Sequence, residues 1–197
     1  DISKKVRHLL RKHDILALSH TGVTGKFDAP TISQFRCISC RPRPYMSKDG
    51  GVAIYVKRRH TEVTLVDEDA EMGSAWIKWG NVIVGLVYIP PESSTVYKHS
   101  DIGMDMSDPL TKLAQQVSYF QAQGHQVILC GDFNARVGTA EDRPPALGGE
   151  DRAAAVMEDG HLALPFCDLP PRVTADQTPP NKMGKLLIEM CMVTGLA

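Results

Sequence analysis

The chain of 197 residues has no uncharged apolar run of about 18 residues, which is the length that a membrane-spanning helix needs. Its first residues form a charged pattern without the apolar segment of a signal peptide. We therefore expect no membrane span and an intracellular protein. Hydrophobic residues make up 43% of the chain and charged residues 23%, which predicts a single globular domain over residues 1–197.

Cysteine is scarce: the chain has five, and their odd number and wide spread disfavour a disulfide framework. Cys37 and Cys40 have the spacing of half a zinc site. The sequence offers no second Cys-x-x-Cys or His-x-x-x-His pair to complete four ligands. Free thiols are therefore the main expectation, and a metal at this pair is the minor alternative.

Charge is distributed unevenly although the net charge is only −1. Residues 1–60 hold 13 Lys and Arg against 4 acidic residues, whereas residues 61–197 hold 9 against 19. Lys57, Arg58 and Arg59 are the candidate nucleic-acid-binding residues, because neutralisation of phosphate by Lys and Arg dominates the affinity of proteins for nucleic acids. The alternative is that these charges lie on ordinary solvated faces.

The periodicity of apolar residues predicts a mixed order of helices and strands. The expected helices are 3–13, 109–123 and 185–196, and the expected strands are 15–18, 51–56, 61–66, 75–79, 81–89 and 127–130. The four middle strands are too close together for crossover helices, so we expect them to form an antiparallel meander. Residues 135–180 are rich in Pro, Gly and acidic residues and predict a long loop. This order favours two packed sheets flanked by helices.

The motif Gly131-Asp132-Phe133-Asn134 follows the apolar strand 127–130 directly. Polar side chains just past a strand end often line ligand sites in α/β proteins, and the Asp132 carboxylate can accept a proton from water or bind a cation. The alternative is a turn in which Asp132 and Asn134 bond their own backbone. Tyr88, before Pro90 and Pro91, is either a phosphate-binding hydroxyl or a packed strand tyrosine.

The motifs occur in a characteristic order along the chain. They are the strand ending near residue 20, Gly50-Gly51-Val52-Ala53-Ile54-Tyr55-Val56, Val87-Tyr88-Ile89-Pro90-Pro91, Gly131-Asp132-Phe133-Asn134, Gly184-Lys185-Leu186-Leu187 and Gly195-Leu196. This set resembles the endonuclease/exonuclease/phosphatase family, most closely the endonuclease domains of non-LTR retrotransposons, which are related to apurinic/apyrimidinic endonucleases. The similarity covers nearly all of the chain.

The resemblance implies an α/β fold, a four-layer α/β sandwich of two mostly antiparallel sheets flanked by helices. It further implies hydrolysis of DNA phosphodiesters with Mg²⁺ or Mn²⁺, and a nuclear location. In this scheme Asp132 positions or deprotonates water and lies near the metal, while Asn134 and Tyr88 hold the phosphate. DNA is then the expected partner.

Two departures from the family pattern predict impaired activity of this segment. His20 occupies the position of a metal-binding glutamate, and imidazole is a poor ligand for Mg²⁺ although it accepts Mn²⁺ or Zn²⁺. The family's opening strand and its C-terminal Ser-Asp-His segment have no counterpart here, so we expect a domain incomplete at both ends. The alternative function is a non-catalytic remnant of the fold that binds nucleic acid or a protein.

Overall fold

The computed structural model describes residues 10–22, 31–41, 51–69, 72–98, 104–138 and 176–196. Its strands are β1 (Ile15–Ser19), β2 (Phe35–Arg41), β3 (Val52–Lys57), β4 (Thr64–Asp69), β5 (Ser74–Trp79), β6 (Val82–Tyr88) and β7 (Gln126–Asp132). Its helices are η1 (Thr95–Tyr97), α2 (Asp108–Ala122) and α3 (Lys182–Thr194).

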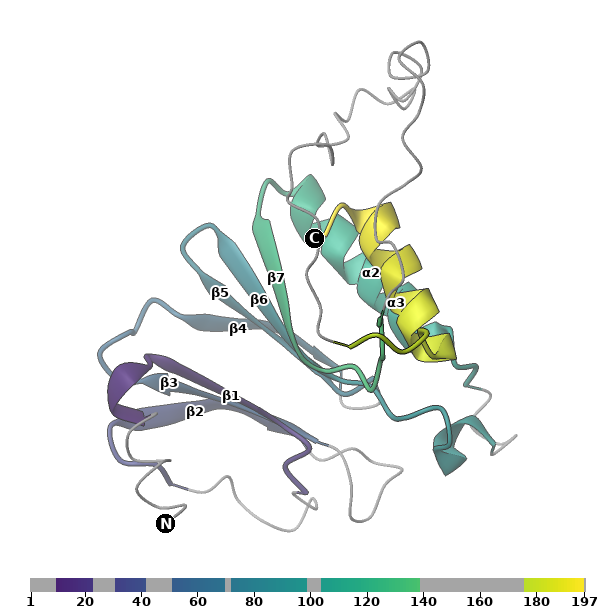
Figure 1. Cartoon of the computed structure of the whole chain (residues 1–197). Coiled ribbons are helices and arrows are strands. Elements are labelled where there is room, and N and C mark those ends of the chain that lie inside the picture. The colour runs from purple at the N-terminus through teal and green to yellow at the C-terminus, as the bar shows by residue number, and fades with distance from the viewer. Residues whose placement is uncertain are drawn as a thin grey trace.

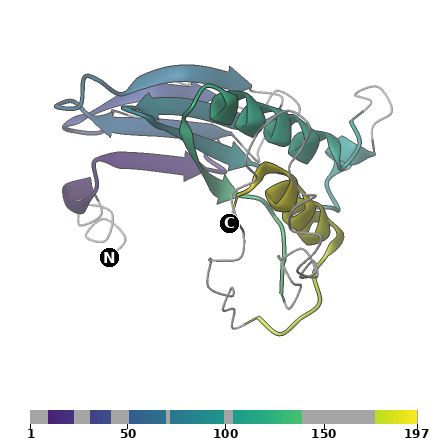
Figure 2. The same cartoon turned by 90° about the horizontal axis from the view of Figure 1, so that it is seen from above.

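The strands form two sheets that pack face to face (Figure 1). One sheet has the order β1-β3-β2 and is antiparallel, and the other has the order β4-β5-β6-β7 with one parallel pair, β6 and β7. Helices α2 and α3 lie side by side over the outer face of the four-stranded sheet (Figures 1 and 2). The predicted α/β fold of two mostly antiparallel sheets with flanking helices is therefore confirmed.

A fourth layer depends on the helix expected for residues 3–13. Residues 10–12 are helical, and the remainder of that helix lies outside the described residues. Leu10 packs against the cluster of Phe35, Ala53 and Tyr55 on the outer face of the three-stranded sheet. The structure thus describes three layers and the start of a fourth.

Alternation along the strands divides the core into two apolar layers, because successive side chains of a strand point to opposite faces. On β5, Ala75 and Ile77 face the other sheet, whereas Trp76 faces the helices. The layer beneath the helices also contains Val87 from β6 and Leu113 from α2. None of these five side chains exposes more than 2% of its surface, so both layers hold the sandwich together.

The helix boundaries follow local signals. α2 begins after Ser107 with Pro109 in its first turn, close to the predicted start, although the Ser107 side chain makes no capping hydrogen bond. α3 begins at Lys182, three residues before the predicted start, because the Asn181 side chain caps it by accepting the Gly184 N–H. Gly195 ends α3 with a φ of 68°, as expected for a C-terminal glycine.

Two features of the strand prediction are wrong. β3 does not join a meander with β4, β5 and β6 but lies between β1 and β2 in the other sheet. β1 and β7, predicted to be buried on both faces, are edge strands, and Leu18 and Ile128 expose 37% and 53% of their surfaces. An apolar run indicates a strand, but its position within a sheet depends on long-range pairing.

β2 was not predicted at all. Its alternation is interrupted by a β-bulge between Cys37 and Ser39, so the apolar pattern of a strand is hidden. Of the predicted long loop, residues 135–138 and 176–180 have neither helix nor strand, and residues 139–175 lie outside the described part. Among the described helices, none is long and apolar enough to cross a membrane.

Candidate functional site

Three strands end at the same side of the sandwich (Figure 1). Tyr88 and Asp132 are the last residues of β6 and β7 and are register partners, because these strands run parallel. His20 follows the last residue of β1 and lies beside Tyr88. The topology therefore brings together three residues that are up to 112 positions apart in the sequence.

A pocket of about 430 Å³ opens at these strand ends. We call it the strand-end pocket, and its lining residues are His20, Tyr88, Pro91, Ser94, Thr95, Asp132 and Asn134. It contains the three predicted catalytic residues and the predicted metal position His20. A second hollow, of about 350 Å³, lies between α2 and β4 and includes none of the predicted site residues.

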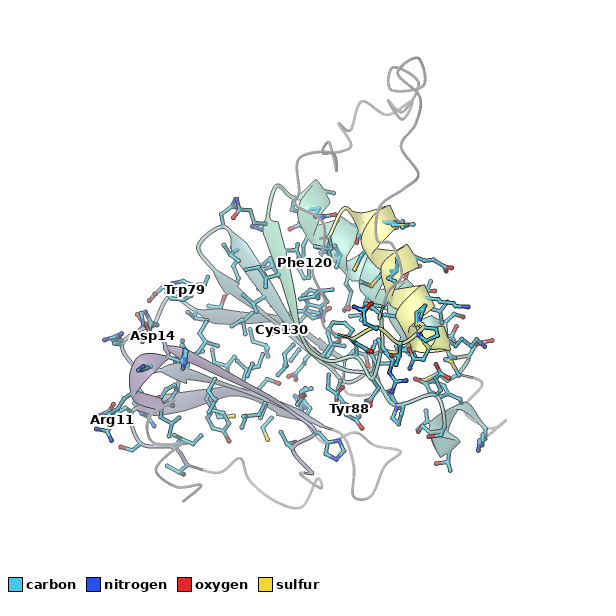
Figure 3. The ribbon with its side chains drawn as sticks, in the orientation of Figure 1. Arg11, Asp14, Trp79, Tyr88, Phe120 and Cys130 are labelled. Carbon is cyan, nitrogen blue, oxygen red and sulfur yellow. The ribbon has the colours of Figure 1, made fainter. Side chains whose placement is uncertain are left out.

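His20 and Tyr88 form a hydrogen-bonded pair. The distance between His20 Nδ1 and Tyr88 Oη is 3.1 Å, and the rings meet edge to face with centroids 5.2 Å apart. Tyr88 exposes only 2% of its surface, so its ring belongs to the core between the sheets while its hydroxyl group lines the pocket (Figure 3). The interpretation as a packed strand tyrosine is thus confirmed for the ring, whereas phosphate binding by the hydroxyl group stays a prediction.

His20 itself has a φ of 55°, which is uncommon for a residue with a side chain. This conformation turns the chain directly after β1, while the hydrogen bond to Tyr88 holds the ring against the pocket. Strained backbone of this kind is often found at functional sites.

The motif Gly131-Asp132-Phe133-Asn134 makes the sharp turn that ends β7. Gly131 has a φ of 139°, and a Cβ atom there would lie 1.9 Å from the Val87 carbonyl oxygen, so only glycine fits. The Asn134 backbone N–H donates to Asp132 Oδ1 at 3.0 Å, and the Asn134 side-chain amide donates to the Ile89 carbonyl at 2.7 Å. The Asp132 side chain therefore bonds the local backbone, as the turn interpretation predicted, whereas the Asn134 side chain bonds the distant Ile89 carbonyl. Both residues also line the pocket.

This turn leaves one oxygen of each side chain for the pocket. Among the described residues, Asp132 Oδ2 and Asn134 Oδ1 have no hydrogen-bond partner. A carboxylate oxygen accepts a proton from water or ligates a cation, and the turn fixes its position. The arrangement can therefore present a fixed negative oxygen beside the Tyr88 hydroxyl group.

Asn181 supports this turn and was not predicted from the sequence. Its Oδ1 accepts the backbone N–H groups of Arg136 and Gly184, and its Nδ2 donates to the Asn134 carbonyl at 3.3 Å. Glu92 adds a second link, because its carboxylate accepts the Met183 N–H at 3.0 Å. An asparagine just before a helical pattern is a typical cap, so a sequence signal for Asn181 did exist.

The three basic residues proposed to bind nucleic acid lie elsewhere. Lys57 ends β3 at the opposite end of the strand from the pocket, roughly 17 Å from Val52 at 3.3 to 3.4 Å per residue. Lys57 and Arg59 both pair with Asp14, at 3.0 and 2.6 Å, and these contacts hold the pKa of the Asp14 carboxyl below its usual value. Arg58 is exposed. The structure therefore does not bring these residues to the pocket.

The metal expectation can be tested against the donor atoms present. Among the described residues, no group of three or more His, Cys, Asp or Glu side chains is placed to hold an ion. The strand-end pocket offers one carboxylate, Asp132, and one imidazole, His20. One carboxylate together with water and substrate phosphate is a common way to hold Mg²⁺, whereas an imidazole suits Mn²⁺ or Zn²⁺ better. The pocket thus fits a divalent ion whose remaining ligands come from substrate and solvent.

Comparison with known proteins gives one family. The sequence model of the Endonuclease/Exonuclease/phosphatase family matches residues 3–187. This range includes every residue of the strand-end pocket. No curated protein matches the chain.

Proposed function

The chain belongs to the Endonuclease/Exonuclease/phosphatase family, and from this membership we propose that the strand-end pocket hydrolyses a phosphodiester bond. Members of this family hydrolyse phosphate esters, and its enzymes generally use divalent metal ions. The observation that carries the proposal is the meeting of Tyr88 with Asp132 and Asn134 at one opening, although Tyr88 lies 44 positions before Asp132 in the sequence.

Each of these residues has a role that follows from its position. Asp132 Oδ2 accepts the proton of the attacking water or orients it, because Oδ1 is held by the turn. The Tyr88 hydroxyl group and the pocket face of Asn134 hold the phosphate. A divalent ion held by Asp132 and the substrate phosphate would offset the charge that develops on the phosphoryl oxygens.

We propose DNA as the substrate and Mg²⁺, or Mn²⁺, as the ion. The support is the order of the sequence motifs, which resembles that of the endonuclease domains of non-LTR retrotransposons. We further propose that turnover is slow in this chain. Asp132 is the one carboxylate among the described lining residues, so the protein itself contributes little negative charge to hold a hard cation.

The test is the nicking of supercoiled plasmid DNA by the chain in Mg²⁺ and in Mn²⁺. Asp132→Asn is the decisive variant, because its amide oxygen can still accept the Asn134 N–H while the charge is removed. We expect slow nicking by the parent chain and a loss of roughly 100-fold or more in the variant. Asp67→Asn, which removes an exposed carboxylate outside the pocket, is the matched control and should leave the rate unchanged.

Equal rates for the parent chain and Asp132→Asn would refute the proposed mechanism. Rapid nicking that Asp132→Asn abolishes would support the pocket but contradict the proposal of slow turnover. Hydrolysis of a small phosphodiester without nicking of DNA would support the chemistry and reject DNA as the substrate.

A second candidate function is phosphate binding without turnover. The observation in its favour is that the Asn134 side-chain N–H and Asp132 Oδ1 form hydrogen bonds with backbone groups at the turn. Half of the polar side-chain atoms of Asp132 and Asn134 are therefore not available to a substrate. This function predicts DNA binding that weakens with salt and survives Asp132→Asn, with no nicking by either protein. Removal of the charges of Lys57, Arg58 and Arg59 tests whether these residues bind DNA. Unchanged DNA binding would exclude them from the interface.

A further inference from the structure

The β-bulge in β2 places two cysteines on one face of the three-stranded sheet. Residues of a regular strand alternate between faces, so Cys37 and Cys40, three positions apart, would lie on opposite faces. In the register of β2 with β3, Cys37 pairs with Tyr55 and Cys40 pairs with Ala53. Two β2 residues, Ile38 and Ser39, therefore lie opposite the single β3 residue Ile54, which is the β-bulge. Cys37 and Cys40 therefore become neighbours on the same face.

Packing identifies that face as the outer one. Tyr55 and Ala53 belong to the outer cluster, against which Cys40 packs, whereas Ile38 packs into the core between the sheets. Cross-strand partners share a face, so Cys37 lies with Tyr55. Both thiols are free, and Cys37 is exposed. The outer face of the sheet thus carries two neighbouring thiols, of which Cys37 is exposed and Cys40 is half-buried.

We propose that Cys37 and Cys40 form a two-thiolate site for a thiophilic d¹⁰ cation of the Cu⁺ class. Soft thiolate ligands select such ions. Two metal–sulfur bonds of about 2.3 Å, the length found with zinc, span roughly 4.6 Å between sulfurs. Side chains that are neighbours on one face of a strand can reach this separation by rotation about χ1.

The geometry disfavours both a disulfide and a structural zinc ion at this pair. The β3 partners of the two cysteines are two residues apart, so the cysteine Cα atoms lie roughly 7 Å apart, at or beyond the limit for a disulfide. A structural zinc ion needs four ligands, and within the described residues no group of three His, Cys, Asp or Glu side chains is placed to hold a metal ion. A two-coordinate cation needs only the two sulfurs.

The test is titration of the reduced chain with Ag⁺ in chloride-free buffer and with Cu⁺ against a competing chelator. We expect one tightly bound ion for each chain, by native mass spectrometry. Cys37→Ser and Cys40→Ser should each raise the dissociation constant of that ion by roughly 100-fold or more, because only one of two soft ligands remains. Cys130→Ala, which removes a thiol from β7, is the matched control and should retain the site.

Three results would overturn the proposal: no tight ion in the parent chain, an unchanged dissociation constant in either serine variant, or one ion shared by two chains. Far-UV circular dichroism of each variant checks the fold. Tyr55→Phe guards against an indirect effect, because it removes the hydroxyl group beside Cys37 without removing sulfur and should keep the tight ion. Loss of the ion in Tyr55→Phe with a native fold would count against a site made by sulfur alone.

Discussion

Replacing Gly131 by alanine should damage both the stability and the chemistry of the strand-end pocket. Gly131 lies where β7 passes closest to β6, and its φ of 139° is rarely adopted by residues with a side chain. An added Cβ atom would lie 1.9 Å from the Val87 carbonyl oxygen and 2.8 Å from the Val87 carbonyl carbon and nitrogen. Because all three atoms belong to the backbone, rotation of a side chain cannot relieve the clash.

The size of the effect can be estimated from two contributions. The unfavourable φ costs about 1 to 3 kcal/mol. Relief of the clash to 3.0 Å requires β7 to move by about 1.1 Å, the difference from 1.9 Å. Such a shift would weaken about two β6–β7 hydrogen bonds, at about 1 kcal/mol each. Gly131→Ala should therefore lower the free energy of unfolding by about 3 to 5 kcal/mol.

Gly124→Ala is the matched control, because Gly124 also has a positive φ, of 79°, but a Cβ atom there would meet nothing within 4 Å. It should cost only the backbone strain, about 1 to 2 kcal/mol. With a slope near 2 kcal/mol per molar urea, the unfolding midpoints of the two variants should differ by roughly 0.5 to 2 M. Agreement of the two free energies within about 0.5 kcal/mol would refute the argument from steric contact with Val87.

Three further outcomes follow from the same structure. The pKa of Asp14 is lowered first by its hydrogen bond to Lys57, so its contribution to stability is present above the ordinary pKa of 3.8 and is lost as pH falls through the lower folded value. Asp14→Asn should therefore flatten the fall in melting temperature below about pH 4, and an unchanged fall would contradict the pairing. Leu113→Ala, at a site 2% exposed, should cost about 2 to 5 kcal/mol in urea unfolding, whereas Tyr119→Ala, at a site 64% exposed, should cost less than about 0.5 kcal/mol. Tyr88→Phe keeps the buried ring, so it should change the free energy of unfolding by less than about 1.5 kcal/mol. It should slow phosphodiester hydrolysis by roughly 100-fold, and equal rates would show that the hydroxyl group takes no part in the mechanism.

The residues of the candidate site could be selected from the sequence because they lie at strand ends. The apolar runs before Tyr88 and Asp132 identified two strands, but the sequence did not reveal that these strands are parallel neighbours. The sequence left open whether Asp132 and Asn134 build a turn or face a ligand. In the structure both side chains bond the backbone at the turn and both residues line the strand-end pocket, while contact with a ligand stays a prediction. A local pattern cannot separate these roles, because they use different atoms of the same side chain.

The parts that sequence reasoning missed depend on distant partners. The sequence did not predict β2, because the bulge at Ile38 and Ser39 breaks the alternation of apolar and polar residues. Its pairing with β3 identifies it as a strand. The sheet in which β3 lies was predicted wrongly, since adjacency in sequence suggested β4 as its neighbour. The sequence did not reveal that Lys57 pairs with Asp14, 43 positions away, while nucleic-acid binding by Lys57 stays a prediction. Propensity and periodicity carry no information about such pairs.

The parallel pairing of β6 and β7 links the helices to the proposed chemistry. Tyr88 and Asp132 are register partners although 44 positions separate them, and parallel strands need a crossover connection, which here contains α2. α2 packs its buried face on the apolar layer that includes Val87, the residue next to Tyr88. A cavity beneath α2, as in Leu113→Ala, should therefore loosen the register that sets Asp132 beside Tyr88. Hydrolysis should then fall more steeply with temperature than in the parent chain, well below the temperature at which the variant unfolds.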